Sequence, residues 1–139
     1  MAIKNEIISI KTSAKSLNDI TLRIEEQVHS SNIKDGICTL FIKHTSASLI
    51  IQENADPSVL RDIENFFKNL VPENNDLYIH TAEGSDDMPA HIRSLLTNTS
   101  LSIPIINKKL QLGTWQGIYL YEHRNHNHER KVIVNVIGE

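Results

Sequence analysis

The stretch Trp115-Gln116-Gly117-Ile118-Tyr119-Leu120-Tyr121-Glu122-His123, followed after a short polar loop by Lys131-Val132-Ile133-Val134-Asn135-Val136-Ile137, indicates the fold class. Both runs are rich in β-branched and aromatic residues, which are typical of strands, and the polar residues 125–130 between them are typical of a loop. A turn at 107–109 and a short strand over 110–112 are predicted just before them. The end of the chain is therefore predicted to be β-structure.

Three helices are predicted from the rest of the chain. The first rests on four apolar residues that recur at helical spacing, Leu17, Ile20, Ile24 and Val28. Asp56-Pro57 is typical of a helix start, because aspartate caps the first turn and proline is favoured at its first position, and one apolar face then continues up to Pro72. A third helix is expected over about 88–97.

The remaining apolar runs predict strands over residues 3–11, 37–43, 49–51, 77–80 and 101–106. Pro104 indicates a sheet edge or a bulge, because proline cannot donate a ladder hydrogen bond. Strands outnumber helices and do not alternate regularly with them, which disfavours a doubly wound or TIM-type fold. We therefore predict an α+β fold, a mostly antiparallel β-sandwich with about three helices, as a single domain over residues 1–139.

The composition excludes several classes of protein. A net charge of −3 with scattered lysines and arginines argues against broad nucleic-acid binding, which needs clustered positive charge. No apolar run approaches the roughly 20 residues that cross a bilayer, so no membrane partner is expected. The N-terminus shows no signal region, and the single cysteine, Cys38, lies in an apolar run and is expected to be a buried thiol. We predict a cytoplasmic protein.

Residues 80–91 combine two imidazoles and three carboxylates around a predicted helix start. A glycine turn, an acidic cap and a proline in the first turn would place Asp87 and His91 one helical turn apart and facing the same way. Asp87 could be an ordinary helix cap. If Asp86 fills that role instead, Asp87 is free to bind a cation or to orient His91.

A metal site is one interpretation of the histidines. His80, His91 and a third donor such as His44 would leave one coordination position open, a pattern typical of catalytic metals. His44 is predicted to share a strand face with the buried side chains of 37–43, so the alternative is a core histidine with hydrogen-bonded nitrogens. The spacing of these histidines matches no short metal motif, and both interpretations stay open.

Other strand ends also carry polar groups. Glu53 and Glu122-His123 each end a predicted strand, which indicates a polar pocket, although strand ends are polar in most proteins. Trp115 lies between glycines that allow close approach of a ligand, and its indole could either stack on that ligand or pack in the core. His126 and His128 are interpreted as part of a solvated hairpin loop rather than as metal ligands.

Taken together, several segments resemble the YjbQ family, in which some members are credited with a secondary thiamine-phosphate synthase activity. The resemblance covers nearly the whole chain. Its carriers are residues 44–48, Glu53-Asn54-Ala55-Asp56-Pro57, residues 80–91, Ile103-Pro104-Ile105, Leu112-Gly113-Thr114-Trp115-Gln116-Gly117-Ile118-Tyr119 and Glu122-His123-Arg124. The family usually has glycine in the turn where this chain has Asn107-Lys108-Lys109, but asparagine tolerates a left-handed turn conformation.

The resemblance implies an α+β sandwich that forms a homotrimer and joins a pyrimidinylmethyl diphosphate to a thiazole phosphate. It implies catalytic roles for His80, Glu83, Asp87 and His91, substrate contacts for Glu53, Trp115, Gln116 and Arg124, and metal binding by His44, His80 and His91. In this interpretation Arg124 pairs with a phosphate, Trp115 stacks on a flat heterocycle and the cofactor is a divalent ion, zinc or magnesium.

Two other functions fit the same residues. Three histidines with an open coordination position would also suit a metal-dependent hydrolase, with Glu83 or Asp87 as the base. The alternative without catalysis is a trimer that binds a metal or a ligand, with the histidines at subunit contacts.

Overall fold

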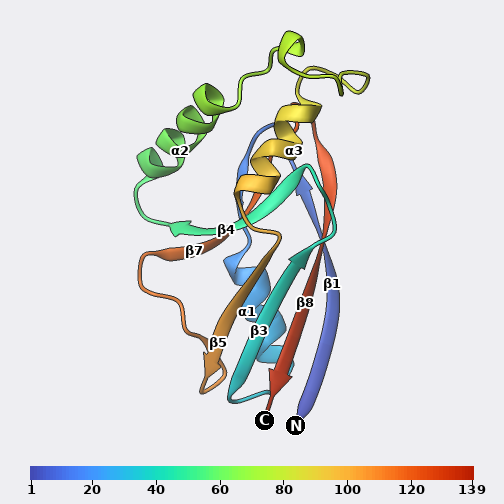
Figure 1. Ribbon diagram of the computed structural model, residues 1–139. Helices are drawn as coiled ribbons and strands as arrows, with labels where there is room; N and C mark the ends of the chain where they lie inside the picture. The colour runs from blue at the N-terminus through green and yellow to red at the C-terminus, as the bar shows by residue number, and fades with distance from the viewer.

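Two antiparallel sheets form the framework of the protein, for which a computed structural model describes residues 1–139 (Figure 1). The five-stranded sheet has the order β1-β8-β3-β5-β6 and the three-stranded sheet the order β2-β7-β4. The strands are β1 (Ala2–Thr12), β2 (Leu17–Asp19), β3 (Gly36–Ile42), β4 (Ala47–Glu53), β5 (Ser100–Ile106), β6 (Lys109–Leu110), β7 (Gln116–Glu122) and β8 (His128–Gly138). Every strand pair is antiparallel, which confirms the predicted fold class.

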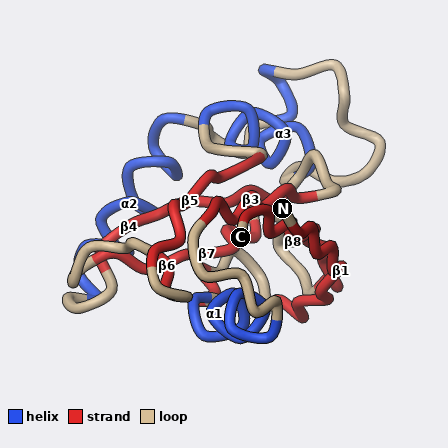
Figure 2. The backbone as a smooth tube through the Cα atoms, turned by 90° about the horizontal axis from the view of Figure 1, so that it is seen from below, coloured by secondary structure: helices blue, strands red, loops and turns tan.

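Three α-helices, α1 (Thr21–Ser30), α2 (Pro57–Leu70) and α3 (Asp87–Leu96), cover the sheets, with α1 on one side and α2 and α3 on the other (Figure 2). Helix α2 begins at Pro57 as predicted, because the Asp56 carboxylate accepts the Ser58 N–H at 2.9 Å. Helix α1 begins later than predicted. Leu17 belongs to β2, and the Asp19 carboxylate then accepts the Thr21 N–H at 2.9 Å. No helix combines the length and the apolar character needed to cross a membrane.

The predicted strand over 77–80 is wrong. A short 3-10 helix, η1 (Asn75–Leu77), stands at its start, because the Asn74 side chain accepts the Asp76 N–H at 3.0 Å. Ile79 is completely exposed, so this segment pairs with no neighbour that would hold it extended. The last loop is also shorter than predicted, since β8 already begins at His128, opposite Thr12 of β1.

The hairpin after β5 agrees with the sequence signals. Pro104 lies near the sheet edge, because β6 pairs only with Ile105 and Ile106. Asn107 and Lys108 have φ angles of 52° and 65°, the left-handed conformation that asparagine tolerates.

The core lies between the two sheets and α1. Alternate residues of the strands point into it, together with Ile24 and Val28 of α1. Cys38 is fully buried there, as predicted, and burial raises the pKa of its thiol to about 12. Strand β7 is buried on both faces, because α2 covers the outer one, where Phe67 meets the ring of Tyr121 edge to face. The polar residues just beyond β7 are therefore held in a rigid frame.

Candidate functional site

Asp87 is the centre of a cluster of ionisable side chains at the start of α3. Its side chain is almost completely buried, and its Oδ2 atom lies 2.7 Å from His80 Nε2 and 3.3 Å from His91 Nε2. One ligand atom from each of the three residues lies within 4.8 Å of the others. The predicted spacing of one helical turn between Asp87 and His91 brings these two side chains together as expected.

The tautomer of His91 follows from its second contact. His91 Nδ1 lies 3.0 Å from the Thr45 carbonyl oxygen, which can only accept, so Nδ1 carries a proton. In neutral His91 the Nε2 lone pair then faces a carboxylate oxygen that also carries lone pairs. Only a proton or a cation between these two atoms makes that contact favourable.

Arg124 holds the other side of Asp87. Its Nη1 lies 2.9 Å from Asp87 Oδ1, its Nε donates to Asp86 Oδ2 at 2.8 Å, and its Nη2 donates to the Glu83 carbonyl at 3.0 Å. Burial alone would raise the pKa of Asp86, but hydrogen bonds from Arg124 and from the Asn125 N–H lower it below its usual value. Each of the three guanidinium nitrogens therefore has an acceptor within the protein. Arg124 holds the two aspartates and the Glu83 carbonyl instead of pointing into solvent.

The turn before α3 depends on Gly84. This residue has a φ of +111°, and a Cβ atom there would lie 2.9 Å from Asp86 Oδ1. Neither candidate cap forms the expected bond, because Asp86 occupies the N-cap position without a capping hydrogen bond from its side chain and Asp87 is the first helical residue. Both carboxylates face Arg124 instead, which leaves Oδ2 of Asp87 for the histidines.

His44 lies outside this cluster. Its Nε2 accepts the Lys131 N–H at 2.8 Å, and its Nδ1 lies 3.4 Å from Nη1 of Arg130. Burial and then the charge of Arg130 lower the pKa of the imidazole. Both ring nitrogens face N–H donors, so the structure does not bring His44 into the ligand set around Asp87. His44 and His91 do line a common cavity of about 230 Å³.

Three of the expected substrate contacts lie at the other end of β7. Gln116 pairs with Glu53 across β7 and β4, and Trp115, which is 63% exposed, directly precedes Gln116. Gln116 lies six residue steps from the end of β7 at Glu122, which corresponds to roughly 20 Å along a strand. The structure therefore does not place Glu53, Trp115 and Gln116 beside Asp87. Glu83, by contrast, is in the loop before α3, with its side chain exposed.

Sequence reasoning missed two groups that define the cluster. The Thr45 carbonyl sets the tautomer of His91, and no side-chain pattern reveals a backbone contact across 46 residues. The ion pair between Arg124 and Asp86 was missed as well. The two residues are 38 positions apart in the sequence and come together only in the folded protein. The neighbouring aspartates 86 and 87 were the available signal, since paired acids need a counter-charge.

Comparisons with known proteins give a consistent result. A family model described as "UPF0047 protein YjbQ-like" matches residues 6–139. The chain is 58% identical to the UPF0047 protein sll1880 of Synechocystis over 96% of this chain and 91% of that protein, and 41% identical to the UPF0047 protein YjbQ of Escherichia coli O157:H7 over 95% and 96%.

Solved structures agree. A YjbQ/UPF0047-family protein of Clostridium acetobutylicum superimposes with a TM-score of 0.87 at 39% identity, over 95% of this chain and 99% of that chain. The conserved hypothetical protein TT1486 of Thermus thermophilus does so with a TM-score of 0.85 at 30% identity, over 95% and 99%. With the sequence matches and the fold in agreement over nearly its whole length, the chain belongs to the YjbQ-like UPF0047 family.

Proposed function

We propose that this protein is a metal-dependent enzyme that holds a divalent ion between His80, Asp87 and His91. The observation that carries the proposal is the contact between His91 Nε2 and Asp87 Oδ2, where Thr45 fixes the imidazole so that its free nitrogen faces a carboxylate. Two nitrogens and one oxygen favour zinc over magnesium, which prefers oxygen ligands. The hydrogen bond from His91 to the Thr45 carbonyl and the ion pair between Asp87 and Arg124 orient these two side chains, as hydrogen-bonded partners commonly orient metal ligands.

The reaction that we propose is the displacement implied by the family resemblance. A pyrimidinylmethyl diphosphate is attacked by the ring nitrogen of a thiazole phosphate, a C–N bond forms, and diphosphate leaves. A divalent ion bound here would neutralise charge on the leaving diphosphate. In this reaction the half-exposed His80 and the exposed Glu83 would transfer protons, while the ion pair with Arg124 holds the Asp87 carboxylate in position.

Hydrolysis is a second candidate, favoured by the ligand set. Two histidines and one carboxylate with an open position resemble the sites in which zinc activates water. In this case Glu83 is the available base, because Asp87 is committed to its histidines and to Arg124. The remaining possibilities, a binding protein without turnover, a homotrimer and a cytoplasmic location, stay predictions.

The first experiment is metal analysis of untagged purified protein. We expect close to one zinc per chain, lost in a His80→Ala, His91→Ala double variant. The matched control is His126→Ala, His128→Ala, which removes another neighbouring pair of imidazoles, 4.6 Å apart between ring centroids. Equal metal content in all three proteins would contradict the proposed site.

Activity then separates the two reactions. Diphosphate released from the pyrimidinylmethyl substrate only when thiazole phosphate is present supports displacement. Release with water alone supports hydrolysis. Bound metal without either reaction supports a binding protein and removes the catalytic part of the proposal.

A further inference from the structure

A cavity of about 260 Å³ lies between the end of α2, the turn that joins β1 to β2 and one side of α3. Its lining consists of Lys15, Lys68, Val71, Pro72, Glu73 and Arg93. Three of these side chains are cationic and one is a carboxylate, so the lining is positively charged. The volume is below the roughly 300–1,000 Å³ of pockets that enclose a whole drug-sized ligand. The cavity therefore suits one small anionic group, and the proposed metal site uses none of its residues.

Arg93 supplies this cavity with a buried positive charge that has free donors. Its side chain is 1% exposed, and its Nη1 donates to both carboxylate oxygens of Glu64, at 2.9 and 3.0 Å. Its Nε and Nη2 donate to no acceptor in the protein. Among fully buried side-chain nitrogens and oxygens only His123 Nδ1 lacks a partner, so Nε and Nη2 of Arg93 are not sealed in the core but reach the cavity. These two nitrogens form one edge of the planar guanidinium, which can donate two parallel hydrogen bonds to a phosphate.

Lys15 and Glu73 form an ion pair at the same cavity. The Lys15 N–H donates to the Arg124 carbonyl at 2.9 Å, and its φ of 39° is a left-handed conformation that lysine rarely adopts. Residues held in such conformations cluster at ligand sites. The Glu73 carboxylate also accepts from Asn125 Nδ2 at 3.2 Å, and its side chain is 27% exposed. Glu73 can therefore turn toward solvent when another anion takes its place beside Lys15.

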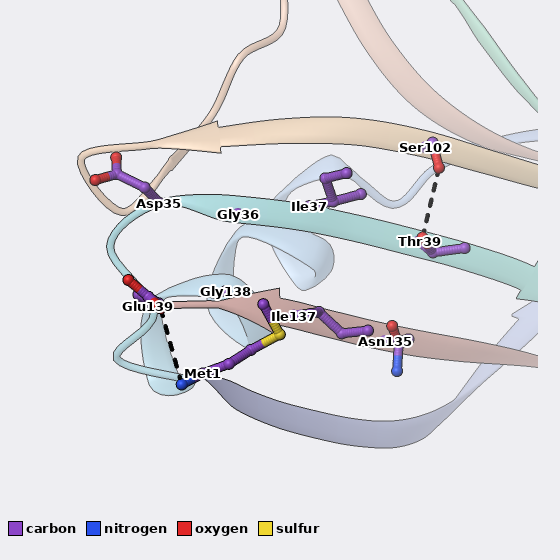
Figure 3. A pocket seen from close by; sticks show the side chains of 10 residues that line it. All are labelled: Met1, Asp35, Gly36, Ile37, Thr39, Ser102, Asn135, Ile137, Gly138 and Glu139. Carbon is purple, nitrogen blue, oxygen red and sulfur yellow. Dashed lines mark hydrogen bonds and ion pairs between the residues drawn. The ribbon is translucent and has the colours of Figure 1, made fainter.

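Two larger hollows lack this combination of charge and burial. One, of about 530 Å³ beside β3 and β8, is lined by Asp35 and Glu139 and by no lysine, arginine or histidine, so it would repel an anion (Figure 3). The other, of about 340 Å³, is lined by His29, Lys108 and Lys109, but all three residues are exposed. Water and salt screen the charge of exposed lysines. Of the three cavities, only the smallest joins a buried guanidinium to ammonium groups.

We propose that this smallest cavity binds a phosphate group, either the free ion or the phosphate of a small monoester. The free edge of Arg93 would bind two phosphate oxygens, and Lys15 and Lys68 would neutralise the remaining charge. Lys68 forms no ion pair within the protein, and Lys15 exchanges Glu73 for the phosphate. Arg124 cannot take this role, because each of its three guanidinium nitrogens already has an acceptor. The binding needs no metal, so it stands or falls separately from the proposed metal enzyme.

The test is calorimetric titration of the metal-free protein at constant ionic strength, with inorganic phosphate and separately with thiazole phosphate. Tighter binding of the ester identifies a phosphorylated small molecule as the ligand, and tighter binding of the free ion identifies phosphate itself. Lys15→Gln should raise the dissociation constant about tenfold, the effect of losing one charge-assisted hydrogen bond. Arg93→Lys keeps the charge, removes the two-donor edge and should also weaken binding. Glu73→Gln should tighten binding, because the internal carboxylate no longer competes.

Matched variants separate a built site from general electrostatics. Lys108→Gln removes a lysine with a similar φ of 65° from the hairpin after β5, and Glu26→Gln removes an exposed acid from α1. Both should leave the dissociation constant unchanged, as should His80→Ala, His91→Ala. Circular dichroism confirms that each variant is folded. Absence of phosphate binding, equal weakening by Lys108→Gln and Lys15→Gln, or loss of binding in the double histidine variant would overturn the proposal.

Discussion

Two clusters of this protein contain the same kinds of side chain and differ in what surrounds them. Asp87 forms an ion pair with Arg124 on one side. On the other side it contacts His80 and His91, whose side chains are 47% and 33% exposed. Glu122 forms an ion pair with Arg130 and is completely buried. A carboxylate whose lone pairs all face fixed donors stabilises the fold, whereas a carboxylate whose remaining neighbours are partly exposed histidines can share a ligand with them.

The Glu122 network is fully satisfied. Its Oε1 accepts bonds from the Thr12 hydroxyl and from Arg130 Nε, and its Oε2 accepts from Arg130 Nη2 and from the Arg124 N–H. Burial raises the pKa of this carboxyl, but the hydrogen bonds from Arg130 and Thr12 outweigh it and the net shift is downward. The network joins β1, β7 and β8, so it connects the two sheets.

Removing Glu122 should have the largest effect on stability. Glu122→Ala leaves Arg130 buried without its partner, which typically costs about 3–5 kcal/mol. Urea denaturation measures the free energy of unfolding. The control, Glu129→Ala, removes an exposed acid from the same region and should leave the free energy of unfolding nearly unchanged. A loss below about 1 kcal/mol for Glu122→Ala would mean that this network does not hold the sheets together.

The next effect is a dependence of stability on pH that comes from His123. Its Nε2 lies 2.9 Å from the Ser48 hydroxyl, its Nδ1 is buried without a partner, and burial, then Arg93 and other cations, lower its pKa to about 3. The unfolded chain binds this proton near pH 6.5, whereas the folded one does not. Stability is therefore complete above pH 6.5 and falls as the pH decreases toward 3, by up to about 1.4 kcal/mol per pH unit.

The interval from about pH 5 to 6.5 isolates this histidine from the carboxylates, whose effects begin near pH 4.5 and below. His44 contributes with the same sign, since its pKa is also lowered. His123→Gln should therefore reduce the slope of unfolding free energy against pH without removing it. An unchanged slope in this variant would show that His123 takes up a proton in the folded protein.

The sequence predicted the features that depend on neighbouring residues. Asp56-Pro57 fixes the start of α2 through one local hydrogen bond, and the glycine, acids and proline of residues 80–91 fix the geometry of Asp87 and His91. These contacts span a few residues, so the local pattern contains them. The alternation of apolar residues also indicated the antiparallel strands, because one buried face imposes a period of two.

The local sequence pattern could not predict features that depend on the pairing of distant strands. His44 was predicted to lie on the buried face of its strand, but β3 ends at Ile42 and His44 is half-buried just beyond it, facing Arg130, which is 86 residues away. Trp115 and Arg124 belong to one apparent motif, yet β7 lies between them and separates them along its length. The strand predicted at 77–80 has suitable residues and no neighbour, which shows that strand propensity acts only where a partner exists.

The smallest effect on stability should come from His91→Ala, and this result separates the two clusters most clearly. His91 is partly exposed and its loss leaves Asp87 paired with Arg124, so the metal-free variant should lose less than about 1 kcal/mol. Zinc at 100 times its dissociation constant should stabilise the natural protein by about 2.7 kcal/mol, and this increment should disappear in His91→Ala. Glu122→Gln should keep the increment while lowering the metal-free stability. Equal stabilisation of His91→Ala and of the natural protein by zinc would contradict the assignment of metal binding to the Asp87 cluster. Asp87 would then have only a structural role, like Glu122.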